Sequence, residues 1–296
     1  MVEEKGSAML GLPLFPFRKD KQDLTGRVAL ITGSAGALGS EAARRLAARG
    51  VRLALADLNS DAVDTLAADL TRSGAEAVAF SGDVLDDAQL HELTAAVIDT
   101  FGRVDVFVSS AGVEINAAFH TVSTREIDTQ LGLHLRSPML MVRDLLPGML
   151  ERNSGHIIVV SSMSGKIPLP VKAPYAAAKA GSIAFCHSLR RELDDTDVAV
   201  SVIAPGVVTG GGQAHRALEG SAVRVPRSLG TVSIGEVATV IDDVLDSRAP
   251  EVAVQATPPF LLNALQSAAP DVTDHILKAS GIGDFWRAVA REQGRT

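Results

Sequence analysis

The sequence predicts an α/β protein built on a doubly wound parallel sheet. Continuous apolar runs rich in β-branched residues alternate along the chain with amphipathic segments rich in Ala and Leu. Runs that are apolar throughout are typical of strands buried on both faces of a parallel sheet. Right-handed crossovers through the intervening helices then produce the doubly wound arrangement.

The predicted elements follow one another without a break in composition as far as about residue 208. Strands are expected at Val28–Thr32, Arg52–Ala56, Ala77–Ser81, Val104–Ser109, Ile157–Ser161 and Val198–Ile203. Helices are expected between them at about 38–49, 60–73, 86–101, 124–150 and 174–193. Three glycines at 210–212 begin a less regular stretch, and a helix at about 235–247 and a strand at Glu251–Gln255 are expected after it.

These elements predict one domain over residues 24–256, with an N-terminal arm (1–23) and a C-terminal helical extension (257–296). The 296 residues are 46% hydrophobic and 21% charged, which is typical of a globular protein. The net charge of −7 gives no indication of a nucleic-acid partner. No apolar run approaches the ~20 residues of a membrane span.

Cysteine and histidine usage gives further expectations. The single cysteine, Cys186, excludes an internal disulfide framework and is compatible with a reducing compartment. The apolar residues 8–17 follow two glutamates instead of a basic region, so a signal peptide is not expected. No histidines stand at metal-ligand spacing, so no metal site is predicted. We therefore expect a cytoplasmic protein without a metal.

Ser162, Tyr175 and Lys179 form a candidate catalytic group. Tyr175 and Lys179 stand four apart in an Ala-rich helical segment and therefore share one helix face. A lysine ammonium beside a phenol favours the ionised phenolate, which makes the tyrosine a usable proton acceptor. Ser162 follows a Val-rich run, so its hydroxyl is expected at the carboxyl end of a buried strand. Taken alone, the Tyr–Lys spacing is more typical of a solvated helix face, but a second motif upstream favours chemistry.

That second motif is a glycine-rich loop after the first predicted strand. Residues 32–39 read Thr-Gly-Ser-Ala-Gly-Ala-Leu-Gly, and a helix begins there. Glycines let the backbone approach a pyrophosphate, and the helix N-terminus supplies free amides and partial positive charge. The position of the loop between strand and helix predicts a Rossmann-type dinucleotide site. Its candidate cofactor contacts are Gly33, Ser34, Gly36, Ala37, Leu38 and Gly39.

Asp57, at the end of the second predicted strand, indicates which cofactor binds. Its separation from the loop along the sequence is close to the ~20 residues expected for an acidic residue that bonds the adenosine ribose. A carboxylate there repels a 2′-phosphate, and no Arg or Lys stands in the loop or just after Asp57, so NAD is expected over NADP. Leu58 is expected beside the cofactor too. Asp83 and Val84 are candidate adenine contacts, although Asp83 fits a simple turn equally well.

Because these motifs follow one another in the right order, the chain resembles the short-chain dehydrogenase/reductase family over about residues 24–255. Within that family it resembles an NAD-preferring subgroup. The resemblance implies that Tyr175 is the acid/base and that Ser162 steadies the substrate oxygen. It implies that Lys179 lowers the pKa of Tyr175 and bonds the nicotinamide ribose. The further cofactor contacts that it implies are Ser110, Ala111, Gly112, Pro205, Gly206 and Val208. It also implies a homodimer or homotetramer through the segments 124–150 and 174–193.

The chain departs from the family pattern at four places. Ala37 replaces the middle glycine of the loop, and Ser109 and Ser110 stand where the family has two asparagines, so a hydroxyl must replace one structural amide contact. Gly210 replaces a threonine, with Thr209 one residue early. His134 replaces the family's catalytic asparagine, and two interpretations are open. It carries a proton between the lysine and solvent, or it packs beside the site with a backbone hydrogen bond.

The sequence therefore predicts an NAD-dependent oxidoreductase that interconverts a secondary alcohol and a ketone. Glu114, Ser164 and Ile167 are candidate substrate contacts, and the mostly apolar set around them, including the 210–225 segment, favours a lipophilic substrate. Two alternatives are an NAD-sensing regulator without turnover and an NADPH-dependent carbonyl or 3-oxoacyl reductase. The complete Ser/Tyr/Lys set disfavours the first, and the lack of basic residues near Asp57 disfavours the second.

Overall fold

The computed structural model describes residues 21–211, 223, 225, 226, 229–255 and 260–296. Most of the predicted N-terminal arm and most of the 210–225 segment, a candidate substrate contact, lie outside these residues. Within them, no helix has the length and apolar character that crossing a membrane requires.

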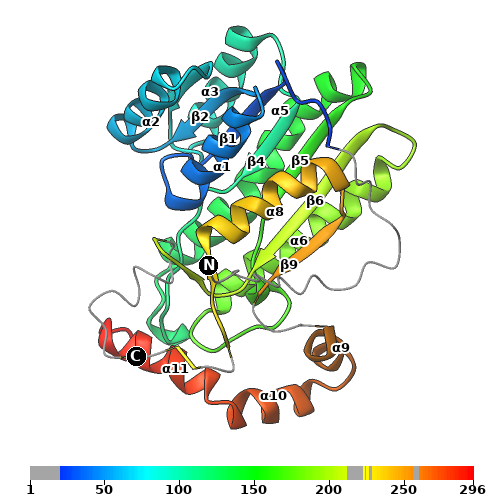
Figure 1. The fold of residues 1–296 in the computed structure, drawn as a ribbon. Coiled ribbons are helices and arrows are strands. Elements are labelled where there is room, and N and C mark those ends of the chain that lie inside the picture. Colours follow the sequence, from blue (N-terminus) through cyan, green and yellow to red (C-terminus); the bar gives the residue numbers. More distant parts are fainter. Residues whose placement is uncertain (1–20, 212–222, 224, 227–228, 256–259) are drawn as a thin grey trace, which may run out of the picture.

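Seven parallel strands form the central sheet in the order β3-β2-β1-β4-β5-β6-β9 (Figure 1). The chain order reverses between β1 and β4, which is where doubly wound sheets bind their ligands. Each predicted strand is present with its ends within two residues, so the predicted fold is confirmed. The strands are β1 (Val28–Thr32), β2 (Arg52–Asp57), β3 (Ala77–Ser81), β4 (Val106–Ser109), β5 (Gly155–Val160), β6 (Val198–Pro205) and β9 (Glu251–Val254).

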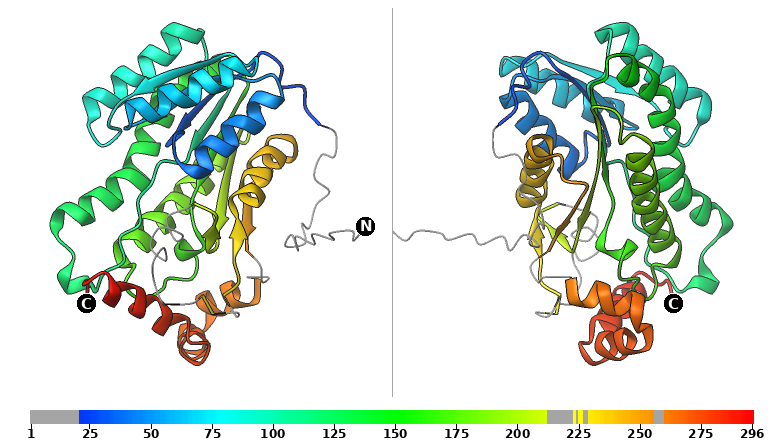
Figure 2. Two further views of the ribbon diagram at one scale, coloured as in Figure 1. Left: turned by 60° about the vertical axis from the view of Figure 1, so that its left-hand side comes forward. Right: turned by 90° about the vertical axis from the view of Figure 1, so that its right-hand side faces the viewer.

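Helices cover both faces of the sheet, as Figure 2 shows in its edge-on views. One face packs against α1 (Ala37–Ala48), α2 (Ser60–Arg72) and α8 (Ile234–Ser247). The other face packs against α3 (Asp87–Phe101), α5 (Ser137–Glu151) and α6 (Ala173–Glu192). Two separate apolar cores result, one on each side of the strands. This double burial explains why most strand positions are apolar, with few polar exceptions inside the sheet such as His156 of β5 and Ser201 of β6.

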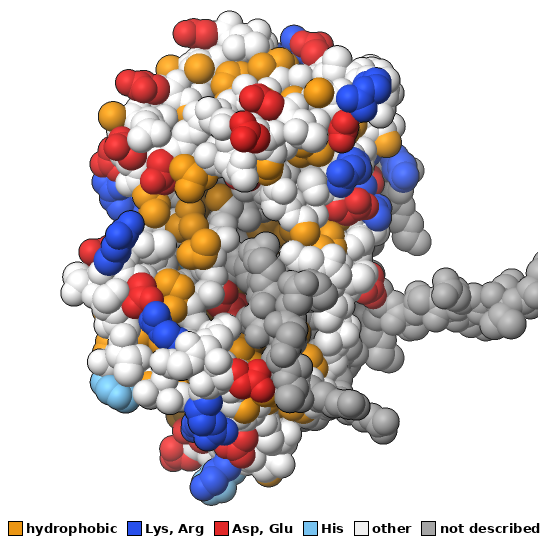
Figure 3. Space-filling view, turned by 90° about the vertical axis from the view of Figure 1, so that its left-hand side faces the viewer, with side chains coloured by type: hydrophobic (Ala, Val, Ile, Leu, Met, Phe, Trp, Pro, Cys, Tyr) orange, Lys and Arg blue, Asp and Glu red, His pale blue; other side chains and the backbone are white. Residues whose placement is uncertain are grey.

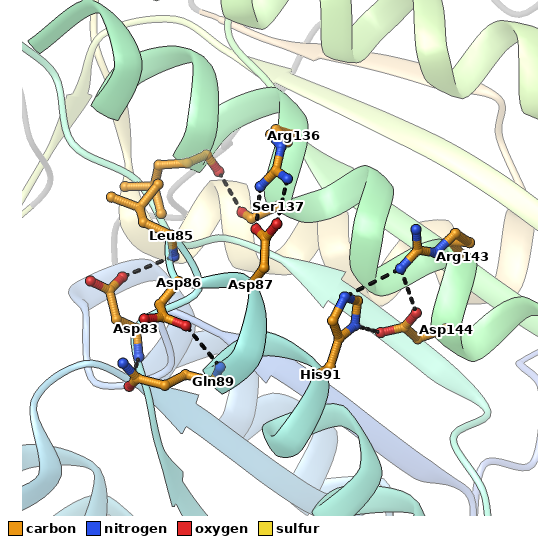
Figure 4. Close-up of polar contacts among 11 residues, drawn as sticks. Asp83, Leu85, Asp86, Asp87, Gln89, His91, Arg136, Ser137, Arg143 and Asp144 are labelled. Carbon is orange, nitrogen blue, oxygen red and sulfur yellow. Dashed lines mark hydrogen bonds and ion pairs between the residues drawn. The ribbon is translucent and has the colours of Figure 1, made fainter. Parts of the chain in front are cut away.

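The predicted helix at 124–150 contains a π-helical turn. It consists of α4 (Thr124–Leu131), a π turn at Gly132–Arg136, and α5. Ion pairs from α3 hold this region, because Asp87 pairs with Arg136 and His91 pairs with Asp144 (Figure 4). A π turn widens the helix locally and is frequent at functional sites. Here it carries His134.

Three helices follow the sheet at the C-terminal end: α9 (Phe260–Ala268), α10 (Pro270–Ala279) and α11 (Ile282–Glu292). They lie beneath the carboxyl edge of the sheet (Figures 1 and 2). Within the predicted C-terminal helical extension, Gly281 has a φ of +72° and separates α10 from α11. A short two-stranded sheet pairs β7 (Val208–Thr209) with β8 (Val232–Ser233).

Candidate active site

A cavity of about 790 Å³ lies at the carboxyl edge of the sheet. Its walls come from the loops after β1, β2, β4, β5 and β6 and from helices α9, α10 and α11. Hydrophobic side chains gather across the middle of the face shown in Figure 3, with charged side chains around them. Both the predicted cofactor loop and the predicted catalytic residues line this one cavity.

Close backbone packing explains the glycines of the loop. Gly33 has a φ of +66°, and a Cβ there would lie 2.6 Å from the Cα of Ala111. A Cβ on Gly39 would lie 2.2 Å from the carbonyl oxygen of Gly33. Ala37 is the first residue of α1, so its backbone is helical and its methyl group is accommodated. The loop thus exposes helix N-terminal amides to the cavity, which fits the pyrophosphate of a dinucleotide.

All but one of the predicted cofactor contacts line this cavity. They are Gly33, Gly36, Ala37, Leu38, Gly39, Asp57, Leu58, Asp83, Val84, Ser110, Ala111, Gly112, Tyr175, Lys179, Pro205, Gly206 and Val208. The prediction for Ser34 is wrong: its side chain is fully buried, and its hydroxyl donates to the carbonyl of Ala56 at 3.2 Å. Ser34 fixes the loop against β2 and turns away from the cavity.

The hydroxyl of Ser110 takes the structural role of the missing asparagine amide. It donates to the carbonyl of Thr32 at 2.6 Å and so ties the loop after β4 to the end of β1. Thr209 does not replace the missing threonine at Gly210, because its hydroxyl bonds the carbonyl of Val232 at 3.3 Å between β7 and β8. Within the part of the chain that the structure describes, Thr209 therefore does not supply that hydroxyl to the cavity.

Asp57 and Asp83 face the adenosine end of the cavity. Asp57 is the last residue of β2, and its carboxylate accepts from the amides of Ala35 and Asn59, each at 3.0 Å. Asp83 accepts from the amide of Leu85 at 2.9 Å, so it forms a turn while also lining the cavity (Figure 4). The turn interpretation of Asp83 is thus correct, and its contact with adenine stays a prediction.

Ser162, Tyr175 and Lys179 converge at the inner end of the cavity. Ser162 follows β5, caps a short 3-10 turn by accepting from the amide of Ser164 at 3.1 Å, and hydrogen-bonds Tyr175. Tyr175 lies in the first turn of α6, and Lys179 lies one turn later. The ammonium of Lys179 donates to the carbonyl of Val160 at 2.7 Å. The loop after β5 and helix α6 together place all three side chains.

Burial dominates the protonation of this group. It raises the pKa of Tyr175, the charge of Glu114 raises it further, and the hydrogen bond from Ser162 opposes them. Burial lowers the pKa of Lys179 to about 7. The expectation that Lys179 lowers the pKa of Tyr175 is not met in this structure, because the ammonium is bound to Val160 and lies 5.7 Å from the ring centroid. Tyr175 is therefore a phenol at neutral pH, the form that donates a proton.

His134 contacts both the β4 loop and the catalytic tyrosine. Its Nε2 lies 2.6 Å from the carbonyl of Val113, so Nε2 carries the hydrogen and Nδ1 is the acceptor. That Nδ1 is buried without a partner among the described residues. The ring meets Tyr175 edge-on, with centroids 5.1 Å apart. Burial, with Lys179 nearby, lowers the pKa of His134 well below its usual value, so it is neutral.

The predicted substrate contacts Glu114, Ser164 and Ile167 also line the cavity. Two residues that the sequence analysis missed lie beside them, Lys172 at the start of α6 and Trp286 of α11. Lys172 pairs with Glu114, and its ammonium lies 3.2 Å from the centroid of the Trp286 ring. A lone charge in the apolar stretch 167–174 was the only signal for Lys172. Trp286 had none, because its place depends on how the C-terminal helices pack.

The chain matches the short chain dehydrogenase family over residues 27–218. The chain belongs to this family. As a short-chain dehydrogenase it is an oxidoreductase that binds a nicotinamide cofactor, and the glycine loop and the lined cavity fit that group. Among the described residues, no cluster of metal-binding side chains occurs.

Three similar proteins illustrate the range of the short-chain dehydrogenases around this chain. A ketoacyl reductase HetN of a Nostoc species is 31% identical and covers 88% of this chain and 92% of its own. A bovine dehydrogenase/reductase SDR family member 7B is 33% identical over 61% of this chain, which spans 58% of that protein. A metagenomic short-chain oxidoreductase solved with NADP is 28% identical, with a TM-score of 0.68 over 80% of this chain and 100% of its own.

Proposed function

We propose that the protein interconverts a secondary alcohol and a ketone with NAD(H). The observation that carries the proposal is the convergence of Ser162, Tyr175 and Lys179 in the cavity that the glycine loop also lines. The bound nicotinamide supplies or accepts the hydride. Tyr175 donates the proton to the carbonyl oxygen during reduction and accepts it during oxidation, while Ser162 orients that oxygen.

The preference for NAD is part of the proposal and rests on Asp57. Its carboxylate lines the adenosine end of the cavity, and the neighbouring Leu58 and Asn59 carry no positive charge. A carboxylate accepts from ribose hydroxyls and repels a 2′-phosphate. Because a similar solved structure contains NADP, both cofactors belong in the assay.

The substrate proposed is lipophilic. Met163, Ile167, Leu169, Leu262 and Leu277 line the part of the cavity around Ser162 and the C-terminal helices. A second candidate is an NADPH-dependent 3-oxoacyl reductase, which the name of the Nostoc relative favours. A homodimer or homotetramer through α4, α5 and α6 also stays a prediction, which light scattering in solution checks.

Tyr175→Phe tests the mechanism. The wild-type protein is assayed with NAD(H) and NADP(H), by nicotinamide absorbance, on a panel of secondary alcohols, ketones and a 3-oxoacyl thioester. The variant is expected to lose turnover by about 10²–10⁴-fold, the usual contribution of a positioned acid/base. Its affinity for NADH, measured by fluorescence, is expected to stay within about threefold of wild type, since Tyr175 is one cofactor contact among many.

Three results contradict the proposal in different ways. Undiminished turnover by Tyr175→Phe excludes Tyr175 as the acid/base. Turnover of the thioester with NADPH alone favours the 3-oxoacyl reductase. NADH binding without turnover of any substrate favours the NAD-sensing regulator.

A further inference from the structure

A buried ion pair lies in the wall of the cavity next to Tyr175. Lys172 is 1% exposed and donates a hydrogen bond to the carboxylate of Glu114, 58 positions earlier in the chain. Both residues line the cavity. Replacing such a pair by apolar side chains of similar volume often leaves stability unchanged or raises it, because burying two charges is costly. The stability of the fold therefore does not explain why charged side chains occupy these positions. Binding a polar group of a ligand would explain it.

The backbone at this point is strained in a way that turns Lys172 inward. Val171 has a φ of +62°, a region that β-branched residues rarely adopt. Its carbonyl accepts from the amide of Ala117 at 2.9 Å, which ties the turn to the loop that carries Glu114. Strained residues of this kind are concentrated at functional sites. The strain and the buried pair are separate observations that indicate one built site.

The ion pair is close to the reacting groups. The ammonium of Lys172 lies 5.9 Å from the centroid of the Tyr175 ring and packs on the face of Trp286. The charge of Glu114 acts on Tyr175 and on Lys179, since it raises the pKa of each. When the reacting oxygen of a substrate hydrogen-bonds Ser162 and Tyr175, the substrate atoms near that oxygen therefore lie beside the ion pair of Glu114 and Lys172.

The pair offers a donor and an acceptor side by side with no net charge. Among the described residues, the one hydrogen bond of the Glu114 carboxylate is that from Lys172, so the carboxylate keeps acceptor capacity toward the cavity. The indole Nε1 of Trp286, a residue 2% exposed, is a buried donor without a hydrogen-bond partner in the part of the chain that the structure describes. A hydroxyl group complements this arrangement, because it donates to the carboxylate and accepts from the ammonium or the indole. A carboxylate on the substrate would meet repulsion from Glu114.

We infer that Glu114 and Lys172 bind a second, neutral hydroxyl group of the substrate, a few bonds from the carbon that exchanges hydride. This inference rests on the proposed function and narrows its substrate class to diols and hydroxyketones with an otherwise apolar skeleton. Glu114 and Lys172 are then specificity-determining residues. They recognise the substrate at a group that does not react.

The test compares substrates that differ only in the second group. Cyclohexanol, the 1,2-, 1,3- and 1,4-cyclohexanediols and 2-hydroxycyclohexane carboxylate are assayed with NAD and NADP. We expect kcat/KM for at least one diol to exceed that for cyclohexanol by tenfold or more in the wild-type protein. Glu114→Gln and Lys172→Met are expected to reduce this ratio to below threefold. Glu76→Gln, which changes an exposed carboxylate paired with Arg52, is expected to keep it.

Each other outcome is decisive. Equal kcat/KM for cyclohexanol and every diol overturns the inference and leaves the proposed function standing. A preference for the hydroxycarboxylate assigns the site to an anion and also overturns it. No turnover of these cyclohexane alcohols, when another secondary alcohol or ketone of the wider panel is turned over, overturns the inference alone, and no turnover of the whole panel contradicts the proposed function. A single variant leaves one buried charge unpaired and can fail to fold. In that case the double variant Glu114→Leu/Lys172→Met removes both charges. If this variant folds and still prefers the diol, the inference is overturned.

Discussion

At the scale of single residues, burial governs the chemistry of the site more strongly than neighbouring charges do. It raises the pKa of Tyr175, lowers that of Lys179 to about 7, and holds that of His134 well below its usual value. A protonated phenol beside a neutral imidazole is the state that ketone reduction requires at neutral pH. In the oxidative direction the same phenol must first lose its proton.

Asp57 is expected to control the choice of cofactor. Asp57→Ala removes the carboxylate that would bond the ribose, so the dissociation constant for NAD should rise at least about tenfold, the loss of one charged hydrogen bond. The ratio of NAD to NADP affinity should fall, because the repulsion of the 2′-phosphate disappears. Titration of both cofactors by fluorescence measures this. Asp61→Ala, an exposed acid on α2, is the control, and an unchanged NAD affinity in Asp57→Ala would exclude the assignment.

His134 is expected to act as a positioning residue through Val113. Its Nε2–H bonds a backbone carbonyl in the loop that leads to Glu114, and a neutral imidazole with so low a pKa is a poor proton carrier. His134→Asn, whose amide can donate to the same carbonyl, should retain kcat within about threefold and an unaltered pH–rate profile. His134→Leu should lose activity about tenfold. A shifted pH–rate profile in His134→Asn would instead support the relay interpretation.

Sequence analysis placed residues correctly at the cavity where their position follows from local backbone geometry, and their functional roles stay predictions. The glycines, Ser162, Tyr175 and Lys179 are fixed by their offsets from strands and helices, and the structure brings them to one cavity. Ser34 was wrong because a side chain in a loop can turn either way, and here Ala56 bonds its hydroxyl. Lys172 and Trp286 were missed because their contact joins distant parts of the chain.

At the scale of elements, the breaks within helices were harder to predict than the helices themselves. The π turn at Gly132–Arg136 begins at a glycine and Pro138 follows it, but neither residue by itself specifies a π turn instead of a continuous helix. The break at Gly281 is different, because glycine is the residue that adopts positive φ without strain. That break sets the direction of α11, which carries Trp286 into the cavity wall.

Two glycines of α11 are expected to respond oppositely to alanine. Gly281 has a φ of +72°, so Gly281→Ala should destabilise the protein by about 1 kcal/mol although the space beside it is open. Gly283 is helical, and a Cβ there would meet the flexible end of Arg287 at 3.3 Å and Pro170 at 3.5 Å. Gly283→Ala should therefore stabilise by about 0.5–1 kcal/mol through helix propensity. Urea unfolding measures both, and equal shifts would contradict the conformational explanation.

At the scale of the whole molecule, the alternation of apolar runs and amphipathic segments was sufficient to predict the sheet and its helix layers. The pattern worked because the central strands are buried on both faces, so their sequences carry no ambiguity of period, and the partly buried edge strands β3 and β9 are also mostly apolar. The position of α9, α10 and α11 against the carboxyl edge was not predictable, since α11 buries Phe285 and Trp286 against residues far away in sequence. The resulting cavity wall depends on that packing.

The buried titratable groups make stability depend on pH across the whole protein. Lys179 has a pKa of about 7 in the folded protein against 10.5 when unperturbed, so between these values the unfolded chain binds the extra proton. Stability should then rise with pH from 7, by at most about 1.4 kcal/mol per pH unit. Burial raises the pKa of Cys186 from 9.0 to about 12 and also raises that of Tyr175 from 10.0, so each contributes a fall in stability above its unfolded pKa. The fall from Cys186 offsets the rise from Lys179 above about pH 9, and the added fall from Tyr175 exceeds it above about pH 10, so stability has a broad maximum between these two values.

Lys179→Met is expected to remove most of the rise between pH 7 and 9, because its buried amine has a pKa of about 7 and releases its proton on folding, while Lys172, whose pKa burial also lowers, remains. Urea midpoints at pH 7, 8 and 9, without added cofactor so that ligand binding does not contribute, measure the slope. Lys278→Met on α10 is the matched control, since that lysine is exposed and should leave the wild-type slope intact. A wild-type midpoint that is flat over this range, or an equal rise in Lys179→Met, would show that Lys179 keeps its proton when the protein folds. Its ammonium would then be charged beside Tyr175 at neutral pH and would favour the phenolate, as the sequence alone suggested.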